Sequence, residues 1–110
     1  MKKESYPVYR YTTPSIVLKF RGLHLTNAEL VRIKLRRGQT EVLRSTAEDG
    51  QIAVDTVENT ATISLTQQES AAFSGGLVTV QAHIRLATGA VAATEQQQIF
   101  FDDNIDEEVL

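Results

Sequence analysis

The sequence predicts an all-β protein: an Ig-like antiparallel β-sandwich of about seven to nine strands, with one short helical turn near residues 67–73. Three observations support this prediction. Within Gly76–Ala87, apolar and polar residues alternate strictly from Val78 to Leu86, which is the period of a strand with one buried and one exposed face. Shorter alternating runs recur along the chain, separated by turn-forming residues. The length of 110 residues suits a single hydrophobic core.

Gly76–Ala87 and Ala90–Phe101 are the two arms of a predicted central hairpin, joined by a tight turn at Thr88-Gly89. In the first arm the core-facing residues are Val78, Val80, Ala82, Ile84 and Leu86. The second arm is irregular, because Glu95–Gln98 is polar on both faces. A β-bulge in this run or just before it would restore the alternation.

Two strands are predicted before residue 22. Tyr6–Thr13 is typical of a short edge strand, because Pro7 and Pro14 lack the amide that an interior strand must donate. Ser15–Arg21 alternates in the same way as the central strand. Its core-facing residues are Ile16, Leu18 and Phe20.

Residues 28–37 admit two interpretations. Thr26-Asn27-Ala28-Glu29 has the spacing of a capping box, which would start a helix. Val31–Arg36, however, alternates cleanly and contains two β-branched residues. The alternation favours a strand, which Arg37-Gly38-Gln39 would connect to a hairpin partner over Thr40–Thr46.

The middle of the chain predicts two further strands and the helical turn. Gln51–Val57 and Thr60–Leu65 are separated by Glu58-Asn59, a turn in which Asn tolerates positive φ. Thr66-Gln67-Gln68-Glu69 is a second capping box. It predicts one or two helical turns, with Phe73 closing one end of the core.

The predicted domain organisation is simple. Residues 1–5 are expected to form a flexible N-terminus, residues 6–101 a single β-sandwich domain, and residues 102–110 an acidic C-terminal tail. No apolar run approaches the roughly 20 residues that a bilayer-spanning helix needs. The N-terminus has no apolar segment of the kind found in signal peptides, so we expect no membrane association.

Residue chemistry gives no indication of catalysis, and the sequence predicts a protein that is not an enzyme and uses no cofactor. The chain has no Cys, which excludes disulfides, thiolate zinc sites and cysteine nucleophiles. His24 and His83 have no partner at metal-ligand spacing. Asp102, Asn104 and Asp106 match the start of a calcium loop, but the required glycine is replaced by Glu107. No metal site is predicted.

Charge is distributed unevenly over a chain whose net charge is −3. We expect a basic face, composed of Lys19, Arg21, Arg32, Lys34 and Arg36. The last nine residues contain five acidic residues and no basic ones. The basic face is typical of a solvated sheet surface, or of a surface that contacts an acidic region of another subunit. No aromatic residues alternate with it for base stacking, so the pattern does not favour nucleic acid as a partner.

Four stretches resemble short phage and prophage proteins related to the N-terminal domain of phage baseplate upper proteins. They are Tyr9–Ile16, Val57–Glu69, Phe73–Ala87 and the acidic C-terminal stretch that ends in Val109-Leu110. Tyr11 stands where that family usually has glycine. The resemblance covers nearly the whole chain and implies a β-sandwich with a structural role in a phage tail.

The resemblance therefore implies a non-enzymatic assembly protein, located in the virion tail or in the host cytoplasm during assembly. Its partners would be other tail or baseplate proteins, or further copies of itself. The residues expected to make protein contacts are Tyr6, Tyr9, Tyr11, Val109 and Leu110, since tyrosine offers a large contact area at low entropic cost. The alternatives are a carbohydrate- or ligand-binding sandwich, and a weak nucleic-acid binder that uses the basic face.

Overall fold

The computed structural model describes residues 8–9, 13–73 and 76–102 of the chain. Over these residues there are nine strands, one α-helix and one 3₁₀ turn. The elements in chain order are β1 (Val8–Tyr9), β2 (Ser15–Lys19), η1 (Leu25–Asn27), β3 (Ala28–Arg37), β4 (Thr40–Ser45), β5 (Ala53–Asp55), β6 (Thr60–Ser64), α1 (Gln67–Ala72), β7 (Gly76–Leu86), β8 (Val91–Ala93) and β9 (Gln97–Asp102).

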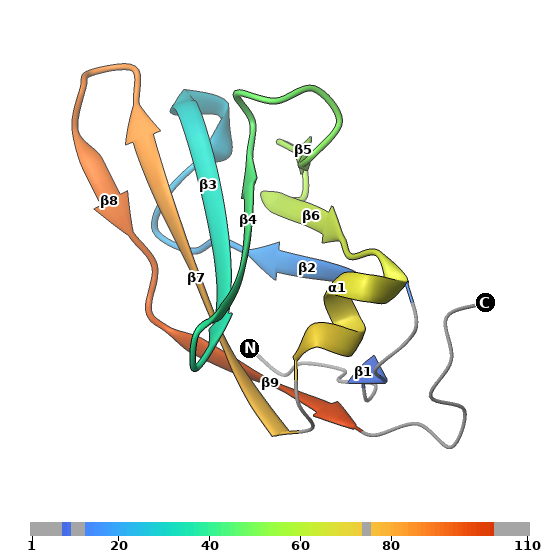
Figure 1. Ribbon diagram of the computed structural model, residues 1–110. Helices are drawn as coiled ribbons and strands as arrows, with labels where there is room; N and C mark the ends of the chain where they lie inside the picture. The colour runs from blue at the N-terminus through green and yellow to red at the C-terminus, as the bar shows by residue number, and fades with distance from the viewer. Residues whose placement is uncertain (1–7, 10–12, 74–75, 103–110) are drawn as a thin grey trace.

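The strands form two sheets, which confirms the predicted β-sandwich. The large sheet has the order β1-β9-β7-β3-β4, with β8 also paired to β7, and the small sheet has the order β2-β6-β5. The strands of the small sheet run across those of the large sheet (Figure 1). This division of consecutive strands between two sheets is the immunoglobulin-type arrangement. The pairs are antiparallel except that of β1 with β9, which is parallel.

Among the described residues, one hydrophobic cluster lies between the sheets. It is formed largely by the apolar residues that alternate along the strands. The predicted core-facing residues of Ser15–Arg21 and of β7 are buried, except that Leu86 at the end of β7 is only partly buried against the cluster. Ala61 and Ile63 of β6 are buried as well. Phe73, which follows α1, is fully buried. Its ring lies 5.3 Å from the ring of Phe101 in β9, centroid to centroid, at 59°. These two rings fill the end of the sandwich next to α1, as the sequence predicted for Phe73.

Residues 28–37 are a strand, the alternative that the alternation favoured. β3 pairs with β4 on one side and with β7 on the other. In place of a helix that starts at Thr26 there is only the short η1 turn, whose N-cap residue is His24 and whose N-cap side chain makes no capping hydrogen bond. Two ladders of backbone hydrogen bonds therefore outweigh a local helix signal.

The predicted bulge lies between β8 and β9. His83 pairs with Ala93 and Val80 pairs with Gln97, so three steps along β7 correspond to four along the other arm. The extra residue is accommodated around Thr94, whose amide donates to the Ala82 carbonyl over 2.9 Å. The Thr94 hydroxyl in turn accepts from the Ala82 amide over 3.0 Å. The bulge bends the second arm of the hairpin, so that β8 and β9 do not lie in one line.

Helix α1 begins with the predicted capping box. The Thr66 hydroxyl accepts from the Glu69 amide over 3.1 Å, and the Glu69 carboxylate accepts from the Thr66 amide over 2.9 Å. Glu69 also accepts a hydrogen bond from Arg44 of β4, whose guanidinium donates to the Ser64 carbonyl as well. Arg44 therefore connects the large sheet to the junction of β6 and α1.

Partial burial by itself would raise the pKa of the Glu69 carboxyl, but the hydrogen bonds from Arg44 and Thr66 outweigh it and hold the pKa below its ordinary value of 4.5. A carboxyl whose pKa is lower in the folded state stabilises the fold when it is ionised. This contribution is fully present above about pH 4.5 and is lost as the pH falls through the folded-state pKa.

We expect Glu69→Gln to lower the free energy of unfolding by about 1–2 kcal/mol at pH 7, because a charge-assisted hydrogen bond and one half of the capping box are weakened. The difference from the unsubstituted protein should shrink as the pH falls through the folded-state pKa of Glu69, which is lowered from 4.5. Urea unfolding at several pH values measures it. Glu48→Gln, in an exposed turn, is the matched control, and an equal loss in both variants would contradict the role of Glu69.

Candidate functional site

The outer face of the large sheet carries three basic side chains in a row. Arg32, Lys34 and Arg36 alternate along β3, and all three are exposed. Their neighbours on β7 are His83, Gln81 and Thr79, in the same order. Together with Leu43 and Gln96, these six residues line a shallow depression of about 270 Å³. We call this surface the basic row.

One carboxylate partly neutralises the basic row. Glu41 of β4 lies 3.9 Å from Lys34 and 3.9 Å from Arg36. Arg32 forms no ion pair with any carboxylate in the described part of the chain. Exposed pairs at this distance contribute little to stability, so the basic row keeps a positive potential that is available to a partner.

An apolar pair lies on the same face, near the N-terminal end of β7. Leu77 of β7 and Phe100 of β9 are directly opposite each other across the two strands. Their exposed fractions are 48% and 51%. Cross-strand neighbours on one face contact each other, so the two side chains form a small apolar patch beside the basic row.

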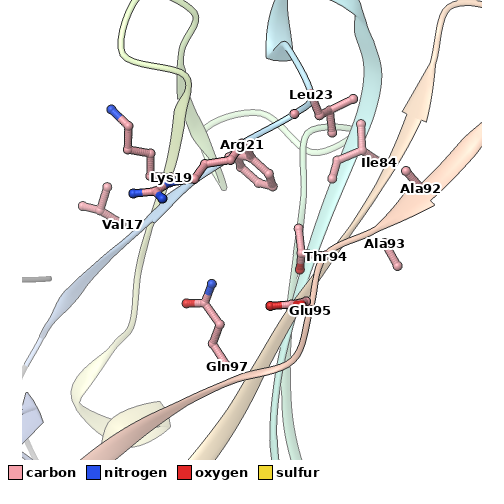
Figure 2. Close-up of a pocket in the computed structure, with 12 residues that line it drawn as sticks. Val17, Lys19, Arg21, Leu23, Ile84, Ala92, Ala93, Thr94, Glu95 and Gln97 are labelled. Atoms are coloured by element: carbon pink, nitrogen blue, oxygen red, sulfur yellow. The ribbon is translucent and has the colours of Figure 1, made fainter. Parts of the chain in front are cut away.

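A larger cleft lies between the two sheets, with a volume of about 750 Å³. Figure 2 shows Val17, Lys19 and Arg21 on one side of it and Glu95 and Gln97 on the other. The apolar part of its lining is Phe20, Leu23, Ile84 and Ala92. The bulge after β8 forms one wall, and the segment that follows β2 forms the other.

Asn59 fixes the shape of that second wall. Its backbone has a φ of 59°. Its side chain accepts from the Leu25 amide over 2.8 Å and donates to the carbonyls of Phe20 over 2.8 Å and Leu23 over 2.6 Å. The turn that the sequence predicted at Glu58-Asn59 is therefore also the anchor of the 20–25 segment.

The structure divides the predicted basic face between the two sheets. Arg32, Lys34 and Arg36 belong to the basic row of the large sheet, whereas Lys19 and Arg21 lie at the cleft beside the small sheet. Alternation along one strand placed the first three together correctly. It contains no information on which sheet β2 joins, so the five residues do not form one surface.

The predicted contact residues Tyr6, Tyr11, Val109 and Leu110 lie outside the described residues. Tyr9 belongs to β1 and its backbone pairs with Asp102 of β9, but its side chain also lies outside the described residues. The role of all five remains a prediction.

The described ranges contain no cluster of three or more His, Asp or Glu residues that could hold a metal ion. His24 and His83 are both exposed. Within those same ranges, no helix is both long enough and apolar enough to cross a lipid bilayer.

Two features were missed by sequence reasoning. The first is the contact of Arg44, which lies on the same face of β4 as the buried Val42. A basic residue on the inward face of a strand indicates an acidic partner across the sandwich. The second is the cleft, which the sequence indicates only through the break in alternation at residues 95–98.

Comparison of the chain with protein-family models and with curated proteins finds no match.

Proposed function

We propose that the chain is a non-enzymatic structural protein of a phage or prophage tail, associated with the baseplate, and that it acts through protein–protein contacts. The observation that carries the proposal is the outer face of the large sheet, where the basic row lies beside the exposed pair Leu77 and Phe100. The resemblance of four stretches of the chain to baseplate-related phage proteins supports the tail assignment.

The outer face has the composition of a protein contact surface. Protein interfaces combine apolar side chains at their centre with polar and charged groups around them. Large apolar side chains that are in contact with each other and exposed on a sheet face mark such surfaces more often than isolated ones do. Uncompensated positive charge at Arg32 would guide an acidic partner to this face.

Mass spectrometry of purified phage particles from the host tests the proposal directly. We expect the chain to be present in a fixed ratio to other tail proteins, or to copurify with tail assembly intermediates. Its absence from both would overturn the tail assignment.

The apolar pair provides a test of the surface itself. We expect Leu77→Gln combined with Phe100→Gln to reduce association with tail partners, or self-association, by about tenfold, because apolar area is lost from the contact. Thermal unfolding should change little, since both side chains are half exposed. Light scattering and pull-down measurements follow the association. Val57→Gln, at a side chain that is 89% exposed in a turn, is the matched control and should behave like the unsubstituted protein.

A second candidate function is weak nucleic-acid binding by the basic row, favoured by the grouping of Arg32, Lys34 and Arg36 on one face. It predicts an affinity for DNA or RNA that falls steeply between low salt and physiological salt. Arg32→Glu should weaken this binding more than Arg85→Glu, because Arg85 is already paired with Glu29 over 3.0 Å. No binding even at low salt would exclude this function.

A further inference from the structure

β2 is an edge strand of the small sheet, and one side of its backbone has no partner strand among the described residues. Leu65 donates to the Pro14 carbonyl, and Phe20 donates to the Asn59 carbonyl. Backbone groups of the even-numbered residues therefore point toward β6, since hydrogen-bonding direction alternates along an antiparallel pair. The amides and carbonyls of Ser15, Val17 and Lys19 point the other way. They are positioned to pair with an added strand.

The cleft lies along this edge. Val17 and Lys19 of β2 are part of its lining, and the opposite wall comes from β8 and the bulge that follows it (Figure 2). An extended segment laid on β2 would have its backbone satisfied by the strand edge. Alternate side chains would then reach the apolar lining at Leu23 and Ala92.

The charge at the opening selects an acidic segment. Lys19 and Arg21 stand on one side of the cleft and Glu95 on the other. Lys19 donates a hydrogen bond to the backbone carbonyl of Glu58 over 3.3 Å. Neither Lys19 nor Arg21 forms an ion pair with a carboxylate of the described residues. The opening therefore has an excess positive charge.

The C-terminal segment of the chain has the matching chemistry. Residues 102–110 contain five acidic residues and no basic ones, and they end in Val109-Leu110. The N-terminal segment is a poorer match, because Lys2 and Lys3 would stand near Lys19 and Arg21. The acidic groups of the C-terminal segment complement the opening, and its two aliphatic residues suit the apolar lining.

The position of β9 indicates whether the segment comes from the same copy of the protein or from a second copy. β9 begins at Gln97, which lines the cleft, and ends at Asp102. The chain therefore leaves β9 roughly 17 Å from the cleft and pointing away from it. A segment from the same copy would have to reverse direction and return the length of β9, whereas a segment from a second copy has no such constraint.

We propose that the cleft accepts the acidic C-terminal segment of a second copy, residues 103–110, as a strand added to the free edge of β2. The proposal rests on the proposed function in that it specifies one contact of an assembly protein. Because donor and acceptor surfaces differ, each copy can give one strand and receive another, so the contact is head-to-tail.

A peptide with the sequence of residues 103–110, labelled with a fluorophore at its N-terminus, tests the acceptor site on the full-length protein. We expect binding that weakens as salt rises. Lys19→Glu combined with Arg21→Glu should weaken it by tenfold or more. Arg32→Glu combined with Lys34→Glu, which makes the same change of charge in the basic row, is the matched control and should change binding by less than twofold. A larger effect of the control pair would place the segment on the outer face and overturn the proposal.

Cysteine pairs identify the donor copy, since the chain has no Cys of its own. We expect full-length Val17→Cys/Val109→Cys to form a ladder of disulfide-linked oligomers under mild oxidation. Leu43→Cys/Val109→Cys, with a similarly exposed partner position on the other sheet, should give far less. A disulfide-closed monomer or the absence of any ladder would overturn the proposal. Either result leaves the tail assignment standing, because detection of the protein in particles does not depend on this contact.

Discussion

Replacement of Asn59 by Ala is expected to lower the free energy of unfolding by about 3 kcal/mol. Two causes add. Three partly buried backbone groups, in Phe20, Leu23 and Leu25, lose their hydrogen-bond partner. Ala must also adopt the positive φ of 59°, which costs an L-residue about 1 kcal/mol relative to Gly or Asn. Urea unfolding monitored by circular dichroism measures the change.

Asn59→Gly separates the two causes. Glycine adopts positive φ freely, so it should recover about 1 kcal/mol of the loss and leave the part due to the hydrogen bonds. Asn27→Ala is the matched control, because the described contacts of Asn27 are made by its backbone. A loss below 1 kcal/mol in Asn59→Ala would show that the Asn59 side chain does not fasten the 20–25 segment.

The same residue shows how far sequence reasoning reaches. A turn with positive φ at Asn59 was predictable, because it depends on neighbouring residues and on the conformational preference of Asn. The hydrogen bonds of its side chain were not, because their partners lie 34 to 39 positions earlier in the chain. Only the pairing of β2 with β6 brings these residues together.

The alternation of apolar and polar residues predicted which face of each strand is buried, but it did not predict which strands share a sheet. It assigned Arg32, Lys34 and Arg36 to one exposed face and Ile16 and Val80 to the core, because a period of two is set by the backbone of each strand. The separation of Lys19 from Arg32 follows from the division of strands between the sheets. That division is decided by long-range pairing, which the local pattern does not contain.

The cleft was unpredictable for the same reason. Its walls come from segments about 70 residues apart, Val17–Leu23 and Ala92–Gln97. The sequence marked only one of them, through the polar run that required a bulge. The bulge interrupts the strand pairing with β7 between Ala93 and Gln97. Thr94, Glu95 and Gln97, which lie in this break or next to it, line the cleft.

Phe73→Ala is expected to have the largest effect of any single substitution considered, a loss of about 3–5 kcal/mol. Phe73 is fully buried and lies against Phe101 at the end of the sandwich that α1 covers. Its removal would leave a cavity between the two sheets, where the rigid pairing of β7 with β9 prevents collapse. A domain of this size is stabilised by only about 5–15 kcal/mol in total, so the variant should unfold at a markedly lower urea concentration.

Phe73→Leu is the matched variant, since it keeps most of the volume and removes only the aromatic contact. We expect it to lose about 1 kcal/mol, the value of an aromatic pair beyond its buried area. Phe73→Ala combined with Phe101→Ala should lose less than the sum of the two single losses, because neighbouring side chains share one cavity. Strict additivity would mean that the rings stabilise the fold independently. In that case the contact between Phe73 and Phe101 would add nothing beyond the burial of each ring by itself.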